Sequence, residues 1–367
     1  MKYLRFPFLL LNFFTVLLLW ITAFCSTVSP NTFGWLALSG YAFPFLFIAC
    51  LVFIALWIFF KKRFCLISIV GLLAVYQPAL TYCPLNSSSS AEESSDSLIT
   101  LLSYNTCDWG NDKAAPVNEM SKNERTKTII EFLKEKNADI LTMQESPLAD
   151  KAKPLIDFYQ YSDTTRGSGD KSVHITLFSK YPILRKESID LESSAAVGAF
   201  WLDVNGREII VINAHLESMH FTINERENFS TMVHGNQNNR DSIRSTSHTI
   251  IGKIYSASKK RARQAEKIAE FIERHRDIPI IMAGDFNDIP NSYVHHTISE
   301  LLTDCYTSTA FGPGYTFKHF GMRARIDNIM CNNYFTPSDC HIIKDISLSD
   351  HQPITCKLKV VDKPVDN

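Results

Sequence analysis

Three long stretches without a charged residue occupy the N-terminal quarter of the chain. Residues 6–28, 33–60 and 64–82 hold no Asp, Glu, Lys or Arg and are rich in Leu, Phe and Ile. A helix rises about 1.5 Å per residue, so roughly 20 apolar residues cross the hydrocarbon core of a bilayer. Each stretch is long enough, and 64–82 is the shortest of them. We therefore predict a membrane anchor in residues 1–83 that contains three transmembrane helices.

The few basic residues of this region indicate its orientation. Lys2 and Arg5 precede the first stretch, and a Lys-Lys-Arg sequence at 61–63 separates the second from the third. Lys and Arg beside membrane spans stay on the cytoplasmic side, which predicts everything after residue 82 on the exoplasmic or periplasmic side. A cleaved signal peptide is the alternative for the first stretch. Against it, Phe24 precedes Cys25 where a lipoprotein processing site needs a small residue, and two further apolar stretches follow.

The net charge divides the chain in the same place. It is -1 for the whole sequence, but residues 1–91 carry +5 and residues 92–367 carry -6. This division excludes a single soluble globule, and the mildly acidic second part excludes a strongly basic protein that packages nucleic acid. Residues 84–97 include seven Ser and three acidic residues, a composition typical of a flexible linker. Residues 362–367 are predicted to form a short tail.

Residues 98–361 are predicted to form one α/β domain. Short stretches rich in β-branched residues alternate with amphipathic helical patterns, which favours layers of sheet and helix. The predicted strands are 98–104, 138–143, 173–179, 209–214 and 278–283, and the predicted helices are 125–136 and 261–274.

Polar residues gather where these predicted strands end, which is where a scaffolded site belongs. In chain order the segments are Ser103-Tyr104-Asn105, Gln144-Glu145, Asn213-Ala214-His215-Leu216, Gly284-Asp285-Phe286-Asn287, Arg325-Ile326-Asp327 and Ser349-Asp350-His351. Together and in this order they resemble the endonuclease/exonuclease/phosphatase superfamily of metal-dependent phosphoesterases. The resemblance implies a four-layer α/β sandwich, in which two mixed β-sheets flanked by helices carry the site along one edge.

The residue types in these segments suit the same chemistry. Hydrolysis of a phosphoester needs a deprotonated water in line with the leaving group and positive charge beside the non-bridging oxygens. Carboxylates and amides, without the Cys and His spacing of a zinc site, favour a hard ion such as Mg²⁺ or Mn²⁺. Glu145, which follows the apolar stretch 140–143, is expected to be the principal metal ligand, assisted by Asn105 and Asp350.

The resemblance also implies catalytic roles for five residues. Asp285 would orient or deprotonate the attacking water, and Asn287 would fix that water or the phosphate. His351 would bind the scissile phosphate, and Asp327 would hold its imidazole in the correct tautomer and charge state. His215 would donate a second hydrogen bond to the phosphate or help to protonate the leaving group.

Two regions are candidates for recognition of the substrate. Residues 219–263 form a polar insertion with eight Lys or Arg and three acidic residues. We predict that it is either a lid over the site, a contact for an anionic surface, or a solvated loop without a specific partner. The second region is Tyr315-Thr316-Phe317, where the alternative is a strand that belongs to the core. Tyr315 and, separately, Arg325 are the candidate substrate-binding residues.

The leading hypothesis is a membrane-anchored, Mg²⁺-dependent phosphoester hydrolase that acts outside the cytoplasm. The basic insertion favours a nucleic acid substrate. Confinement near a bilayer favours a phospholipid headgroup, as in a phosphodiesterase of sphingomyelinase type. A non-catalytic membrane protein that binds a phosphorylated ligand is the hypothesis of a different class. Glu145, Asp285 and His351 together favour catalysis, because binding alone requires no carboxylate that activates water.

Overall fold

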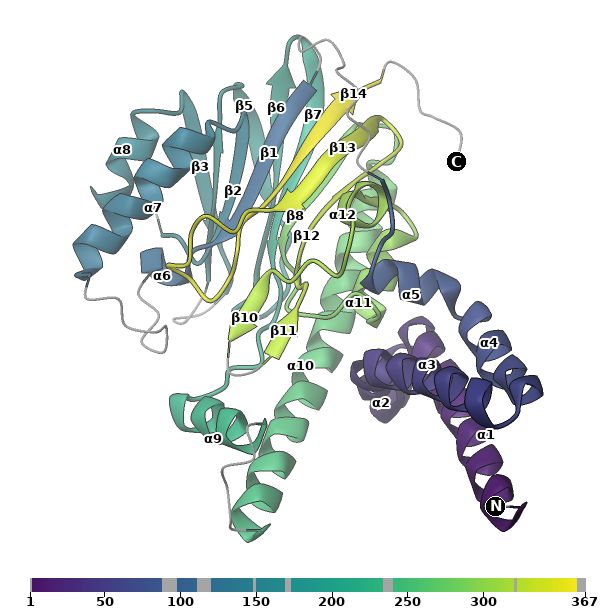
Figure 1. Ribbon diagram of the computed structural model, residues 1–367. Helices are drawn as coiled ribbons and strands as arrows, with labels where there is room; N and C mark the ends of the chain where they lie inside the picture. The colour runs from purple at the N-terminus through teal and green to yellow at the C-terminus, as the bar shows by residue number, and fades with distance from the viewer. Residues whose placement is uncertain are drawn as a thin grey trace.

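The computed structural model describes residues 2–87, 98–110, 120–147, 150–168, 173–233, 240–319 and 322–361. Most of the predicted linker (88–97), part of the insertion (234–239) and the predicted tail lie outside these ranges. A region of apolar helices packs beside a sandwich of two β-sheets (Figure 1).

Five helices make up the N-terminal region. They are α1 (Lys2–Phe24), α2 (Pro30–Ser39), α3 (Phe43–Phe60), α4 (Cys65–Leu73) and α5 (Tyr76–Tyr82). The segments Arg5–Thr27 and Pro30–Phe60 are each long and apolar enough to cross a membrane, and α4 with α5, bent by 65°, forms a candidate third span. Large apolar side chains such as Phe45 (74% exposed) and Phe59 (85% exposed) cover their surface. These segments coincide with the three apolar stretches of the sequence.

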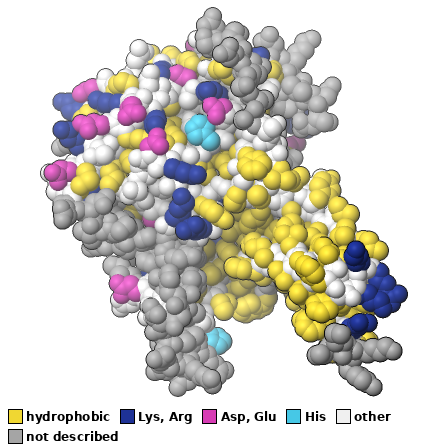
Figure 2. Space-filling view, viewed as in Figure 1, with side chains coloured by type: hydrophobic (Ala, Val, Ile, Leu, Met, Phe, Trp, Pro, Cys, Tyr) yellow, Lys and Arg dark blue, Asp and Glu magenta, His cyan; other side chains and the backbone are white. Residues whose placement is uncertain are grey.

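The basic residues of this region lie at its far end from the sandwich. Leu9, near the start of α1, packs with Trp57 and Phe64, which flank the turn at 61–63. The start of α1 and the turn between α3 and α4 therefore lie together, and Lys and Arg side chains gather at this end (Figure 2). The opposite end, at residues 25–42, contacts the sandwich.

Each large sheet of the sandwich has six strands. The first has the order β13 (Phe335–Ile342), β14 (Ile354–Val360), β1 (Leu98–Asn105), β2 (Ile140–Gln144), β4 (His174–Ser179) and β3 (Tyr161–Arg166). The second has the order β5 (Ile183–Ser188), β6 (Ala196–Val204), β7 (Arg207–His215), β8 (Ile280–Asp285), β12 (Asp327–Cys331) and β9 (Thr303–Asp304). The β1–β2 and β7–β8 pairs are parallel and the other pairs are antiparallel, so both sheets are mixed. A separate hairpin is formed by β10 (Phe317–His319) and β11 (Met322–Ala324).

Three apolar cores hold the four layers together. The central core lies between the sheets, where Leu101 and Ile140 of the first sheet meet Val211 and Ile281 of the second. Helix α7 (Lys122–Lys136) covers the first sheet, and it begins with a capping box between Ser121 and Glu124. Helices α10 (Arg240–Arg274) and α11 (Tyr293–Ser299) cover the second sheet. The predicted four-layer sandwich of two mixed sheets is confirmed.

The insertion is largely helical rather than a loop. Residues 223–233 form α9 (Ile223–Val233), and residues from 240 onward form the first part of α10. Ile250, Ala257 and Ala262 are buried, and the first two are seven residues apart, which is about two helical turns. The N-terminal part of α10 extends away from the sandwich with α9 beside it (Figure 1). The part of α10 at 261–274 was predicted, whereas the polar part before it was not, because its small buried residues form no continuous apolar stripe.

Candidate active site

Strand pairing brings the polar segments to one edge of the sandwich. The parallel strands β1 and β2 pair Asn105 with Gln144, and the parallel strands β7 and β8 pair His215 with Asp285. Strand β12 is antiparallel to β8 and begins opposite Asp285, at Asp327. Because β1, β2, β7 and β8 end at this edge and β12 begins there, residues far apart in the sequence become neighbours.

Asn105 connects the two sheets at this edge. Its Nδ2 donates hydrogen bonds to Glu145 Oε1 and Asp285 Oδ2, both at 3.1 Å. Its Oδ1 accepts a hydrogen bond from the backbone N of Cys107 at 3.1 Å, which fixes the orientation of the amide. One amide therefore holds a carboxylate from each sheet.

His215 makes a second connection between the same carboxylates. Its Nε2 lies 3.1 Å from Glu145 Oε1 and 3.7 Å from Asp285 Oδ2. The ring is 2% exposed, and its Nδ1 has no hydrogen-bond partner among the described residues. The Nε2 edge of the imidazole is the edge that faces the cluster.

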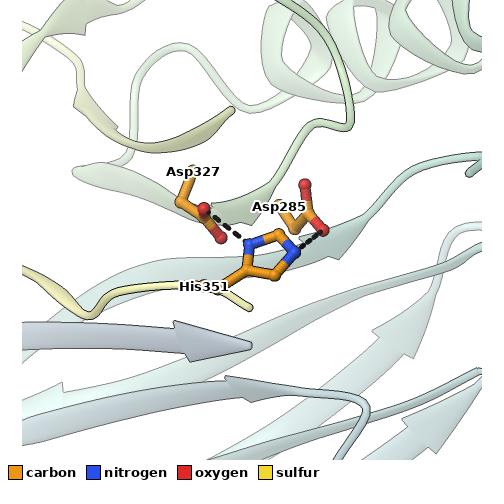
Figure 3. A group of neighbouring side chains, drawn as sticks. All are labelled: Asp285, Asp327 and His351. Atoms are coloured by element: carbon orange, nitrogen blue, oxygen red, sulfur yellow. Dashed lines mark hydrogen bonds and ion pairs between the residues drawn. The ribbon is translucent and has the colours of Figure 1, made fainter. Parts of the chain in front are cut away.

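His351 lies between two carboxylates (Figure 3). Its Nδ1 is 2.8 Å from Asp327 Oδ2, and its Nε2 is 3.7 Å from Asp285 Oδ2. The backbone N of Asp327 donates to Thr316 Oγ1 at 3.1 Å, and the ring of Phe317 packs edge-on against the imidazole at 5.2 Å. The hydrogen bond to Asp327 and the contact with Phe317 therefore both orient the His351 ring.

Asn287 supports Asp285. The backbone N of Asn287 donates to Asp285 Oδ1 at 2.8 Å, and its Nδ2 lies 3.2 Å from Asp285 Oδ2 and 3.0 Å from Leu216 O. Asn287 and Glu145 both have a φ of 53°, in the left-handed region that residues with a side chain rarely adopt. Backbone strain of this kind is concentrated at functional sites.

The electrostatic environment keeps Glu145 ionised. Burial alone would raise the pKa of Glu145, but the hydrogen bond and charge of His215 and the hydrogen bond from Asn105 outweigh it and lower the pKa to about 2. Burial would lower the pKa of His215, yet its hydrogen bond to Glu145 and the charge of Asp285 raise it. The two residues therefore favour an ion pair.

The pKa values of Asp285 and His351 depend on a different balance of burial and neighbouring charges. Burial, reinforced by the charge of Asp327, raises the pKa of Asp285 to about 6 despite the opposing charges of His351 and His215. Burial would lower the pKa of His351, but the charges of Asp327 and Asp285 and the hydrogen bond to Asp327 raise it well above its usual range. A carboxylate that titrates near neutral pH next to a cationic imidazole is a typical acid–base arrangement.

The comparison with protein families assigns this domain. The family model described as endonuclease/exonuclease/phosphatase family matches residues 109–351, which is more than half of the chain. This chain belongs to the endonuclease/exonuclease/phosphatase family. Members of this family generally hydrolyse phosphoester bonds and typically depend on a divalent metal ion. A second model, described as a domain of unknown function (DUF8431), matches residues 5–82.

Solved structures of the family share the fold of the sandwich. Humanized TDP2 from D. rerio is 17% identical, with a TM-score of 0.50 over 72% of this chain and 100% of that one. A family protein from Bacteroides thetaiotaomicron is also 17% identical, with a TM-score of 0.50 over 72% of this chain and 98% of that one. One from Beutenbergia cavernae is 15% identical, with a TM-score of 0.50 over 72% of each chain. No curated protein matches the sequence.

Two places at the edge offer oxygen ligands for the divalent ion typical of the family. Atoms of Asp285, Asp327 and His351 lie within 4.8 Å of one another. However, His351 Nδ1 and Asp327 Oδ2 are already bonded to each other at 2.8 Å, which leaves fewer free ligand atoms in this group. Glu145 fits better, because its carboxylate is ionised and its side chain is 37% exposed. Carboxylate and amide oxygens are the ligands that Mg²⁺ prefers.

Three residues expected in the family site lie at its margin or away from it. Asp350 Oδ1 is 3.4 Å from Ser349 Oγ, and this hydroxyl donates to Asn105 O at 2.8 Å, so Asp350 lies beside the end of β1. Tyr315 is 37% exposed and lies two residues before the hairpin that packs on His351. Arg325 is buried, and its hydrogen bonds to Asp304, Asn328 and Thr81 lead away from the cluster of Asp285 and His351.

Some supporting residues were not predicted from the sequence. Gln144 Nε2 donates to Asn213 Oδ1 at 2.7 Å behind the site, and Asn213 Nδ2 donates in turn to backbone oxygens of Met143 and Thr176 at 3.1 and 3.0 Å. This buried amide pair links the two sheets directly beneath Glu145 and His215. Both amides occur in the recognised segments, but nothing in the sequence distinguishes a bracing amide from a ligand.

Proposed function

We propose that the protein is a membrane-anchored phosphoester hydrolase that depends on Mg²⁺ or Mn²⁺ and acts on the exoplasmic or periplasmic side. The observation that carries this proposal is the continuous set of contacts from Asn105 through Glu145, His215 and Asp285 to His351, each at 3.7 Å or less. It joins a candidate metal carboxylate to a candidate base within one cluster.

The proposed mechanism assigns a task to each side chain. Glu145, with Asn105 and Asp350 beside it, would hold the divalent ion, and the ion would supply positive charge beside the phosphoryl oxygens. Asp285, with a pKa of about 6, accepts the proton of the attacking water.

The remaining polar residues act on the phosphate and on Asp285. Asn287 fixes the Asp285 carboxylate through its backbone and side-chain N–H groups. His351, held by Asp327, donates from Nε2 to the phosphate. His215 donates from Nε2 to the phosphate or to the leaving oxygen.

We propose the following division of the chain into domains. Residues 1–83 are the anchor, 84–97 the linker, 98–361 the catalytic domain with the insertion 219–263, and 362–367 the tail. The proposed orientation is supported by the position of the basic residues, which gather at the far end of the helices from the sandwich. With those cations in the cytoplasm, the sandwich lies on the opposite face of the membrane.

The substrate is proposed to be a phosphodiester, in nucleic acid or in a phospholipid headgroup. One observation favours the lipid: the loop that follows Asp285 contacts the helical anchor, since Tyr41 Oη donates to Asp288 Oδ1 at 3.3 Å. The candidate base is therefore only three residues from a direct contact with the anchor. The basic residues of the insertion favour nucleic acid.

The deciding experiment uses the full chain reconstituted in lipid nanodiscs. Plasmid DNA and phospholipid vesicles are each incubated with the protein and Mg²⁺, with and without EDTA. We expect cleavage of one of the two substrates, abolished by EDTA and by Asp285→Asn or His351→Ala, with the circular dichroism spectrum of each variant unchanged. Metal binding without cleavage of either substrate would support the non-catalytic alternative, and full activity of either variant would exclude the assigned roles.

A further inference from the structure

We infer that the membrane anchor is a positioning element of the active site: Tyr41 holds the loop that carries Asp285 and Asn287 by bonding to Asp288. This inference rests on the proposed function for its catalytic consequence. The anchor then does more than confine the domain to a membrane, because it fixes the geometry at the edge where the reaction takes place.

Asp288 joins the anchor to the long helix of the insertion. Its Oδ1 accepts a hydrogen bond from Tyr41 Oη at 3.3 Å, and its Oδ2 accepts one from Arg261 Nε at 3.0 Å. Asp288 is 7% exposed and Arg261 is fully buried. Arg261 Nη1 also donates to Glu217 O at 3.0 Å, two residues after His215. A buried carboxylate with few other partners is sensitive to the loss of any one of them.

The site and this junction belong to the same short loop. Asn287, the immediate neighbour of Asp288, holds Asp285 through its backbone N and is itself tied to Leu216 O at 3.0 Å. The hydrogen bonds of Asn287 to Asp285 and to Leu216 O leave little freedom to absorb a shift of Asp288. A displacement of Asp288 therefore reaches the Asp285 carboxylate directly.

A second contact holds the far end of the loop. Asn291 Nδ2 donates to Thr22 O of α1 at 2.7 Å. Gly40 faces Asn291 so closely that a Cβ at this position would lie 2.9 Å from Asn291 O. Glycine is required for this approach. The loop 286–291 is thus fixed to the anchor at two points.

A third contact reaches the segment that carries Asp327. Arg325 Nη2 donates to Thr81 O at the end of α5 at 3.0 Å, and Arg325 Nη1 donates to Asp304 Oδ2 at 2.9 Å. Pro84 O accepts from the backbone N of Gly312 at 2.8 Å, so the first residues after α5 also contact the domain. These contacts converge on the two segments that supply Asp285 and Asp327, whereas a flexible tether would need none of them.

The test compares full-length variants in nanodiscs. Tyr41→Phe removes the donor to Asp288, and Asp288→Asn removes the charge that Tyr41 and Arg261 share. Tyr76→Phe is the matched control, since Tyr76 is exposed on α5. The first readout is hydrogen exchange in residues 286–291, and the second is the Mg²⁺-dependent hydrolysis of bis(p-nitrophenyl) phosphate.

We expect Tyr41→Phe to speed exchange in this loop by about tenfold and to lower kcat by a similar factor with KM unchanged. Asp288→Asn also loses the buried ion pair with Arg261, so it should have the larger effect. Adding Tyr41→Phe to Asp288→Asn should change exchange less than Tyr41→Phe does alone, because the two residues are coupled through one hydrogen bond. Tyr76→Phe should behave as the unmodified protein. Unchanged exchange and unchanged kcat in Tyr41→Phe would overturn the inference, as would a uniform rise of exchange throughout the chain. If the unmodified protein does not hydrolyse the probe, the proposed function fails, while the exchange result still decides whether the anchor holds the loop.

Discussion

His351 Nδ1 lies 2.8 Å from Asp327 Oδ2, and neither residue is more than 5% exposed. This hydrogen bond leaves Nε2 as the only ring nitrogen directed toward Asp285. A histidine with one nitrogen committed to a buried carboxylate has a fixed tautomer and a stabilised cationic form. The interaction sets both the direction and the charge of the group proposed to bind phosphate.

Asp327→Asn is expected to lower kcat by about 100-fold. The amide is neutral, so it lowers the pKa of His351 and removes the cationic donor from the phosphate. The pH–rate profile of phosphodiester hydrolysis should lose activity at a lower pH than in the unmodified protein, because the imidazole deprotonates earlier. Asp277→Asn, at an exposed position, is the control. Matching profiles for the unmodified protein and Asp327→Asn would contradict the assigned role.

Glu145→Gln is expected to weaken binding of Mg²⁺ or Mn²⁺ by at least tenfold, since a hard cation loses its charged oxygen ligand. Isothermal titration calorimetry of the full chain measures this without any need for turnover. Glu187→Gln, on the exposed edge strand β5, should leave the affinity unchanged. Equal affinities for Glu145→Gln and the unmodified protein would move the metal site elsewhere.

Asp304 is expected to make the stability dependent on pH. Burial would raise the pKa of Asp304, but the charge of Arg325 and the hydrogen bond and charge of His295 outweigh it and hold the pKa well below its usual range. Because the carboxyl pKa is lower in the folded than in the unfolded chain, its stabilisation is complete above about pH 5 and declines as the pH falls below about 4.

The corresponding variant is Asp304→Asn. It leaves the buried Arg325 without its carboxylate partner, so the free energy of unfolding at pH 7 should fall by about 3 kcal/mol. Thermal unfolding in detergent between pH 3 and pH 7 should also show a flatter pH dependence than in the unmodified protein. Asp157→Asn, at an exposed site, serves as the comparison. Parallel curves for the unmodified protein and Asp304→Asn would show that this carboxylate contributes nothing to acid sensitivity.

The orientation of the anchor predicts a labelling pattern. Cys83 is exposed at the end of α5, whereas the other cysteines are buried or, at Cys107, half-buried. A membrane-impermeant maleimide should therefore label Cys83 in intact cells. In a Cys83→Ser background, Lys62→Cys should react only after the cells are permeabilised, because Lys62 belongs to the cationic turn. The reverse pattern would place the catalytic domain in the cytoplasm.

The five predicted strands are all largely buried, although the buried strands β6 and β12 were not predicted. Strands β1, β2, β4, β7 and β8 have apolar interiors, and a continuous apolar run is a strong signal. The edge strands were not predicted, because β3 has the sequence YSDTTR and β5 is largely exposed. Such strands are stabilised by pairing with neighbouring strands, and their own composition does not indicate a strand.

The residues of the site that lie at the ends of predicted strands could be predicted from the sequence. Asn105, Glu145, His215 and Asp285 were expected together because each stands at the end of a predicted strand. The environment of Arg325 could not be predicted, since its partners Asp304 and Thr81 come from distant segments. The contact between Tyr41 and Asp288 was equally inaccessible, because no sequence pattern connects an anchor residue to a loop of the domain.

The contacts at Thr22, Tyr41 and Thr81 have a geometric consequence. One tether would leave a rigid body free to rotate, whereas three separate points of attachment fix both its tilt and its height. With the proposed spans in a bilayer, the edge that carries Asp285 and His351 stands at a constant distance from the membrane surface. Under the proposed function, the anchor would restrict cleavage to phosphoesters that reach this distance from the membrane surface.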